Sequence, residues 1–234
     1  MDGNPALTSQ LKYVSIAGID IGIYDSGPVG VLVSGGADSA ILLYVVMKYV
    51  TNSPIHIYAS INTGIISEQG PAFDNVVSTC SRLTDNTNFI LHKNVLEIDD
   101  SAVYFDMCNN ALNSGEVDIL YKGLTIFPDH DVWKDWELTS DFQENYDARP
   151  PGVVQPLWGI SNFGGDPNCS IGDRLYKPWV NHNKQDIAAI YRELGVEKEL
   201  YPVSRSCEAW PLEGQHCGRC WWCRERIWGF GYLQ

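Results

Sequence analysis

The chain has 234 residues, 44% of them hydrophobic and 19% charged, and its formal net charge is −13 at pH 7. This length suits one α/β domain with a sizeable core, so we expect a single domain over residues 1–234. A surface this acidic repels phosphate backbones, which argues against a nucleic-acid partner. No apolar run approaches the ~20 residues that span a bilayer, and the first residues lack the pattern of a secretory signal. We therefore expect a cytoplasmic protein with no membrane partner.

Apolar periodicity predicts strands and helices that alternate along the first half of the chain. Residues 1–28 contain an alternating pattern that predicts one or two N-terminal strands. Later strands are expected at 29–34, 55–62, 88–98 and 117–125, and helices between them at 39–50, 70–83 and 101–114. This alternation predicts a parallel, doubly wound, Rossmann-like sheet with helices on both faces.

The second half of the chain is less regular. Residues 127–176 are rich in Pro, Gly, Asp and Trp. A loop of this length inside a compact domain often covers an active site or forms an interface, and we expect one of these roles. A helix is predicted at 183–195, with Gly195 at its carboxyl end. Four cysteines follow within residues 204–228, near the end of the chain.

The string Ser-Gly-Gly-Ala-Asp-Ser lies where the expected strand at 29–34 meets the next helix. In open parallel sheets, ligands bind at such carboxyl ends of strands. Two glycines let the backbone approach a ligand, and the N–H groups of residues 35–39 then point at one spot. We therefore expect a phosphate site formed by Ser34, Gly35, Gly36, Ala37, Asp38 and Ser39. Asp38 would orient the loop or help to hold Mg²⁺. The alternative is a tight turn in which Ser34 or Asp38 caps the helix.

The cysteine segment has the spacing of a metal site. Cys207, Cys217, Cys220 and Cys223 follow the pattern C-x9-C-x2-C-x2-C. Pairs two residues apart reach one tetrahedral ion, and four thiolates complete its coordination, which favours structural Zn²⁺. An iron–sulfur cluster takes the same ligands and is an alternative. A site in which His216 replaces one cysteine and a set of four unliganded thiols are the other possibilities.

These two motifs together resemble a known family. Residues 34–39 are similar to the SGGxDS loop of the PP-loop ATP pyrophosphatases. Residues 204–226, which include Ser206, His216, Gly218 and Arg226, resemble the zinc segment of the 7-cyano-7-deazaguanine synthases, a branch of that family. The resemblance covers residues 30–50 and 176–230. It implies a PP-loop ATPase domain with an adenine nucleotide alpha hydrolase-like sheet and a zinc-stapled C-terminal segment.

The resemblance also implies an activity, namely that of an ATP-dependent carbon–nitrogen ligase. Such an enzyme adenylates 7-carboxy-7-deazaguanine, releases pyrophosphate, and uses ammonia to form the amide and then the nitrile of queuosine biosynthesis. ATP and Mg²⁺ would bind residues 34–39, and the adenine would lie near Ser60 and Thr63. Asp38, Lys184 and Asp129 would be catalytic. The resemblance implies a homodimer as well.

The middle of the chain departs from this family. Members usually have Y-G-Q-x-H after the second strand, where this chain has other residues, and Y-P-D-C-R after the fourth, of which only Pro128 and Asp129 are kept. The acid is therefore open. Alternatives are a ligase for another small carboxylate, a deazapurine conjugation, a tRNA-modifying enzyme and a nucleotide-binding module without activity. Lys93, Lys122 and Lys177 are further candidates to neutralise phosphates, against the alternative of solvated surface lysines.

Overall fold

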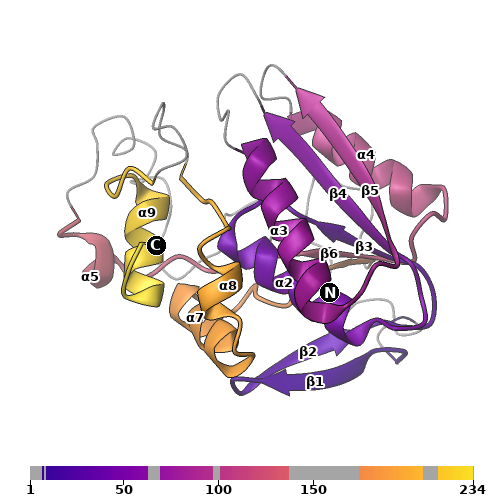
Figure 1. Cartoon of the computed structure of the whole chain (residues 1–234), viewed down its shortest axis with the longest axis horizontal. Helices are drawn as coiled ribbons and strands as arrows, with labels where there is room; N and C mark the ends of the chain where they lie inside the picture. Colours follow the sequence, from indigo (N-terminus) through magenta and orange to yellow (C-terminus); the bar gives the residue numbers. More distant parts are fainter. Residues whose placement is uncertain are drawn as a thin grey trace.

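A parallel five-stranded sheet forms the centre of the molecule (Figure 1). The computed structural model describes residue 7 and residues 9–62, 69–96, 101–136, 174–207 and 216–233. The strands are β3 (Val29–Leu32), β4 (Ile55–Asn62), β5 (Phe89–Leu96), β6 (Ile119–Lys122) and β7 (Leu175–Tyr176). Their order is β5-β4-β3-β6-β7, and every neighbouring pair is parallel. The expected parallel α/β fold is confirmed. The two-residue strand β7 was not expected, because it is too short to carry a periodic pattern.

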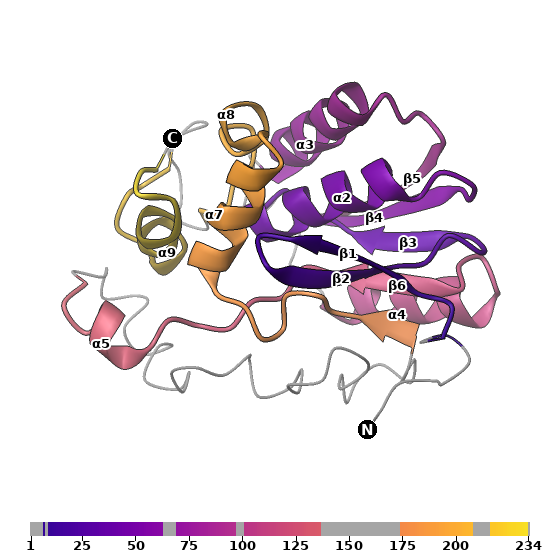
Figure 2. The same ribbon diagram turned by 90° about the horizontal axis from the view of Figure 1, so that it is seen from below.

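Helices cover both faces of this sheet (Figure 2). α2 (Ala37–Tyr49) and α3 (Gln69–Thr84) lie on one face, and α4 (Ser101–Asn113) lies on the other. α2 is buried along almost its whole length because it packs against the sheet, α3 and α7. A smaller apolar cluster fills the space between the sheet and α4. Cys80 and Cys108 are buried in these two cores, as their apolar helix faces predict.

The N-terminal strands form a separate hairpin. β1 (Lys12–Ile16) and β2 (Ile19–Ile23) pair antiparallel. Ala17 and Gly18 form the turn with φ values of 52° and 75°, the left-handed conformation of a tight two-residue hairpin. The backbone N–H of Gly22 donates to the hydroxyl of Tyr176, which joins the hairpin to β7.

Four helices are described in the second half of the chain. They are α5 (His130–Trp133), α7 (Lys184–Glu193), α8 (Glu197–Leu200) and α9 (Trp221–Phe230). α7 was expected, and Gly195 follows it with φ of 71°, as predicted. α9 was not expected, because its buried residues do not follow one amphipathic stripe. Among the described residues, no helix combines the length and the apolarity that crossing a bilayer requires.

Candidate functional site

The glycine-serine loop joins β3 to α2 at the carboxyl end of the central strand. Gly36, and neither Ser34 nor Asp38, is the N-cap residue of α2. The hydroxyl of Ser34 accepts from the N–H of Gly36 at 3.3 Å. The hydroxyl of Ser39 donates to the carbonyl of Gly36 at 3.0 Å and accepts from the N–H of Ser34 at 3.2 Å. The serines thus fold the loop, and the first turn of α2 presents its N–H groups to a ligand.

Two features require glycine at position 35, namely its backbone conformation and the closeness of α3. Its φ is 84°, a left-handed conformation that glycine adopts without strain. A Cβ atom at this position would lie 3.1 Å from the backbone nitrogen of Phe73 in α3. The loop can therefore lie this close to α3 only with glycine at position 35.

Asp38 forms a buried ionic network with α7 and α9. The Lys184 ammonium donates to Asp38 Oδ2 at 2.5 Å, and Glu225 Oε2 lies 3.4 Å from the same ammonium. Lys184 is 4% exposed, so burial alone would lower its pKa. The two carboxylates outweigh burial and raise the pKa above its ordinary value. Lys184 is therefore a fixed positive charge beside the loop.

The second carboxylate oxygen of Asp38 has a different environment. Asp38 Oδ1 is buried and has no hydrogen-bond partner among the described residues. Leaving such an atom unpaired is costly, unless a ligand or an ion completes its interactions. Carboxylate oxygens are preferred ligands of Mg²⁺, so this atom fits a magnesium ion that accompanies a nucleotide.

Local structure holds Lys184 in place at the start of α7. Asn183 is the N-cap of this helix, and it forms a capping box with Asp186. A Cβ atom on Gly229 of α9 would lie 2.5 Å from Lys184 Cγ, so only glycine allows the two helices to come this close. From the same helix, the hydroxyl of Tyr191 donates to the carbonyl of Ala37 at 2.8 Å. α7 thus contacts the loop at two points.

The segment before the cysteines is bonded directly to the loop. The backbone N–H of Arg205 donates to the carbonyl of Gly35 at 2.7 Å. The buried Arg226 donates to the hydroxyls of Ser204 and Ser206, at 3.0 and 3.4 Å. The Nε and Nη1 atoms of Arg205 are buried without a hydrogen-bond partner in the described part of the chain. Two arginines therefore belong to this site: Arg226 supports the segment, and Arg205 has two nitrogen atoms without partners among the described residues.

The four cysteines meet at one point. Their sulfur atoms all lie within 4.8 Å of one another, so they could hold a metal. Cys217 Sγ lies 3.8 Å from Cys223 Sγ, and Cys207 Sγ lies 3.9 Å from Cys220 Sγ. The backbone N–H of Cys220 donates to Cys217 Sγ at 3.2 Å. His216 lies beside them, with Nδ1 3.6 Å from Cys223 Sγ.

The remaining candidate residues are more scattered. Ser60 is half-buried near the carboxyl end of β4, and Asp129 is exposed next to α5. Lys93 pairs with Asp74 of α3 at 2.9 Å. Lys177 is fully buried, so the alternative of a solvated surface lysine is wrong there. Thr63 and residues 137–173 of the irregular stretch lie outside the described residues.

Sequence reasoning missed several residues of this site. They are Gly123, Tyr191, Arg205, Glu225 and Gly229. A Cβ on Gly123 would lie 3.0 Å from the carbonyl of Asp38, so this glycine lets the end of β6 approach the loop. Gly123 could have been predicted, because it directly follows the strand at 119–122 and glycine at such a position often allows another backbone to come close. No local sequence pattern predicts a role in the site for the other four residues.

Comparison with known proteins gives structural likeness only. No protein-family model matches the chain, and no curated protein sequence matches it. Among solved structures, it is similar to the U34-tRNA thiolase NcsA from Methanococcus maripaludis with its [4Fe-4S] cluster, at 16% identity and a TM-score of 0.47. That match covers 81% of this chain but 62% of the thiolase. The NMN synthetase from Francisella tularensis matches at 13% identity and a TM-score of 0.36, over 88% of this chain and 78% of that one.

Proposed function

We propose that this protein is an ATP-dependent carbon–nitrogen ligase of the PP-loop type, and that it resembles the 7-cyano-7-deazaguanine synthases in its reaction. The observation that carries the proposal is the loop at residues 34–39. It lies at the carboxyl end of the central parallel strand and begins α2, and the buried Lys184 stands beside it. This combination of backbone donors and a fixed cation suits the pyrophosphate of ATP.

The residues of the site support a division of roles. The N–H groups at the start of α2 would hold the pyrophosphate as it leaves, where negative charge develops. Mg²⁺, bound through Asp38 Oδ1, would neutralise part of that charge. Lys184 would keep the carboxylate of Asp38 in place. The free donors of Arg205, whose backbone is bonded to Gly35, would contact phosphate oxygens.

The proposed reaction balances in two stages. A carboxylate oxygen of the acid attacks the α-phosphorus of ATP, and the bond to the β-phosphate oxygen breaks, so pyrophosphate leaves. Ammonia then attacks the activated carbonyl carbon, loses a proton and displaces AMP to give an amide. A second ATP then adenylates the amide oxygen and releases a second pyrophosphate, and loss of AMP together with the two protons of the amide nitrogen gives the nitrile. The proposed acid is 7-carboxy-7-deazaguanine or a related carboxylate.

For the cysteine segment, the spacing supports one structural Zn²⁺. Four thiolates at about 2.3 Å from a tetrahedral zinc ion lie about 3.8 Å apart. The two measured sulfur–sulfur distances, 3.8 and 3.9 Å, agree with this value. A four-iron cluster separates its cysteines further, because each sulfur binds a different iron at a corner of the cube. The ion would hold residues 204–207 against the loop.

The test is product analysis with a defined acid. The protein is incubated with Mg·ATP, ammonium and 7-carboxy-7-deazaguanine, and the products are identified by mass spectrometry. We expect the amide and the nitrile, and no product from the Asp38→Ala variant. If ATP is consumed only with another carboxylate from a panel, the PP-loop assignment stands and the deazapurine assignment fails. If no acid supports ATP consumption, both assignments fail.

A further inference from the structure

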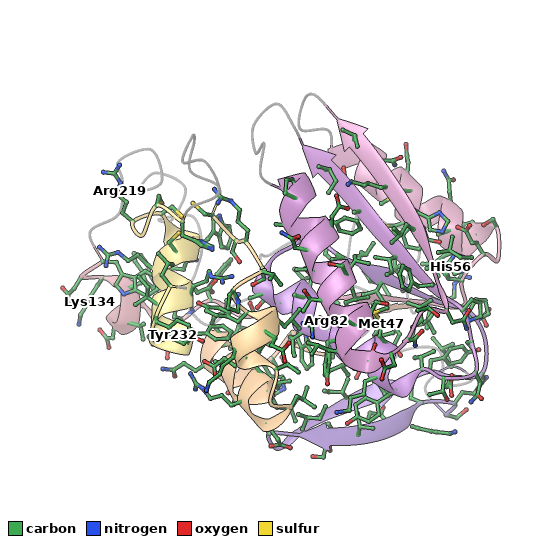
Figure 3. The ribbon with its side chains drawn as sticks, viewed as in Figure 1. Met47, His56, Arg82, Lys134, Arg219 and Tyr232 are labelled. Carbon is green, nitrogen blue, oxygen red and sulfur yellow. The ribbon has the colours of Figure 1, made fainter. Side chains whose placement is uncertain are left out.

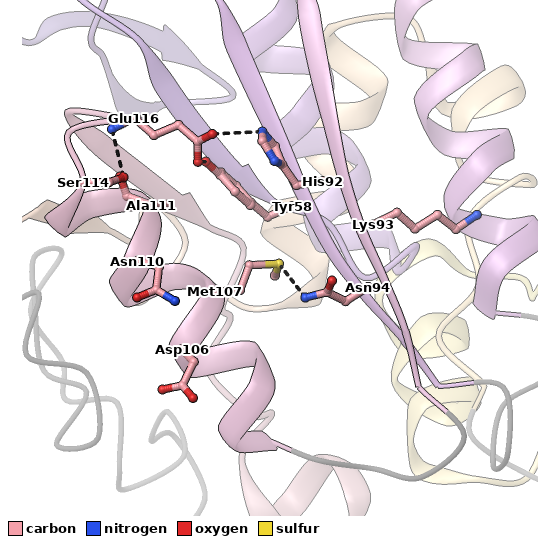
Figure 4. A pocket seen from close by; sticks show the side chains of 10 residues that line it. All are labelled: Tyr58, His92, Lys93, Asn94, Asp106, Met107, Asn110, Ala111, Ser114 and Glu116. Carbon is pink, nitrogen blue, oxygen red and sulfur yellow. Dashed lines mark hydrogen bonds and ion pairs between the residues drawn. The ribbon is translucent and has the colours of Figure 1, made fainter.

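A second group of metal-binding side chains lies far from the loop. His56 is on β4, His92 is on the adjacent strand β5, and Glu116 lies in the turn between α4 and β6. His56 and Tyr58 are two residues apart, and Tyr58 pairs with His92 across the strands. The side chains of His56, Tyr58 and His92 therefore point to the same face of the sheet, which is the face that α4 covers. Figure 4 shows Tyr58, His92 and Glu116 converging beside α4.

The three ligand atoms form a triangle of a suitable size. His56 Nδ1 lies 3.0 Å from His92 Nε2, and Glu116 Oε1 lies 3.8 Å from each of these nitrogens. The point equidistant from the corners of this triangle lies about 2.1 Å from each atom, which is the length of zinc–nitrogen and zinc–oxygen bonds. The three atoms are therefore spaced as the ligands of an ion of this class would be.

Neighbouring groups already hold the ligands in this arrangement. The hydroxyl of Tyr58 donates to Glu116 Oε2 at 2.6 Å, which leaves Oε1 directed at the two histidines. The ring of Tyr58 stacks on that of His92, with centroids 4.5 Å apart. Partners of this kind orient metal ligands in known sites.

Two of the three ligands, His92 and Glu116, line a pocket. The pocket has a volume of about 550 Å³, and its lining also includes Asp106 and Asn110. Three protein ligands leave room at such an ion for water or for an incoming ligand. Two imidazoles with one carboxylate favour transition metals such as Zn²⁺ over Mg²⁺.

A direct hydrogen bond between the two imidazoles is the competing explanation. It accounts for the 3.0 Å between the nitrogens. It leaves Glu116 Oε1, 3.8 Å from each nitrogen, without a hydrogen bond to either ring. An ion at the centre of the triangle would bind all three atoms.

We propose that His56, His92 and Glu116 form a second divalent transition-metal site, of the zinc class, with an open coordination position facing the pocket. The site is independent of the cysteine segment. In Figure 3, His56 and Arg219 of that segment lie at opposite sides of the molecule. It is also independent of the proposed ligase function, because none of its ligands belongs to the nucleotide site.

Titration with Co²⁺ tests this proposal and separates the two sites. Cobalt bound to thiolates has strong charge-transfer bands in the near ultraviolet, whereas cobalt bound to nitrogen and oxygen has only weak visible bands. We expect two equivalents in the parent chain, one of each kind. The His92→Ala variant should lose only the Co²⁺ ion that shows no charge-transfer bands. His182→Ala is the matched control, because its side chain is 30% exposed, close to the 26% of His92.

Two conservative variants complete the test. Glu116→Gln keeps the shape of the side chain and an acceptor for Tyr58 but removes the charged ligand, so it should weaken Co²⁺ binding at this site at least about 10-fold. Tyr58→Phe should weaken it by about 10- to 100-fold, since it releases the carboxylate. If the parent, His92→Ala and Glu116→Gln bind the same number of Co²⁺ ions with equal affinity, the proposal is wrong.

Discussion

Asp38 is the residue on which the proposed nucleotide site depends most directly. Its two oxygens have separate environments, one bonded to Lys184 and one buried without a partner among the described residues. Asp38→Asn keeps an acceptor for Lys184 and removes the charge that Mg²⁺ requires. We expect the rate of pyrophosphate release to fall by about 100-fold or more, as for loss of one transition-state contact. Asp131→Asn is the control, because that side chain is 87% exposed on α5, and its rate should equal that of the parent.

Lys184 is predicted to matter for stability as well as for binding. Lys184→Met leaves the buried carboxylate of Glu225 and the partly buried carboxylate of Asp38 without their common cation. Breaking a buried pair in this way costs about 3–5 kcal/mol of unfolding free energy. Urea denaturation measures the loss, with the exposed Lys134→Met as control. Adding Glu225→Gln to Lys184→Met should recover part of the lost unfolding free energy. If Lys184→Met loses no more unfolding free energy than the control, this account of the network is wrong.

At the scale of elements, the close contact between α7 and α9 sets the position of Lys184. Gly229→Ala would place a Cβ 2.5 Å from Lys184 Cγ and 2.7 Å from its carbonyl oxygen. The helices must then separate, which lowers the unfolding free energy by about 1–3 kcal/mol. The affinity for ATP should fall as well. Gly70→Ala in α3 is the matched control, because its Cβ would meet only Ile61 at an ordinary 3.5 Å. Thermal unfolding compares the two, and equal melting temperatures would rule out this role for Gly229.

The elements also show what the sequence could predict and what it could not. Strands β3 and β4 and helices α2 and α7 were predictable because apolar periodicity and capping residues are local signals. The loop at residues 34–39 and the spacing of the four cysteines were predictable for the same reason. Glu225 and Tyr191 were not, because each reaches the site through a helix packing contact between residues distant in sequence. The short strand β7 and the one-turn helices α5 and α8 are too brief to carry a pattern.

At the scale of the whole molecule, the cysteine segment and the loop at residues 34–39 form one unit. The hydrogen bond from Arg205 to Gly35 and the contacts of Arg226 with Ser204 and Ser206 connect them. Removing the proposed Zn²⁺ with a chelator should therefore weaken binding of a non-hydrolysable ATP analogue, because the segment loses its support. Calorimetry before chelation, after chelation and after addition of Zn²⁺ measures this coupling. Unchanged affinity in the chelated protein, once loss of the metal is verified, would show that the segment is not needed by the loop.

The position of ATP cleavage tests the central claim of this account most directly. Phosphorus NMR of the reaction with Mg·ATP, ammonium and the carboxylate substrate distinguishes cleavage between the α and β phosphates from cleavage between the β and γ phosphates. The loop at residues 34–39, with Lys184 beside it, is predicted to hold the departing pyrophosphate, so AMP and pyrophosphate should appear in equal amounts. ADP with inorganic phosphate, or an unchanged ATP spectrum with every acid offered, would contradict it.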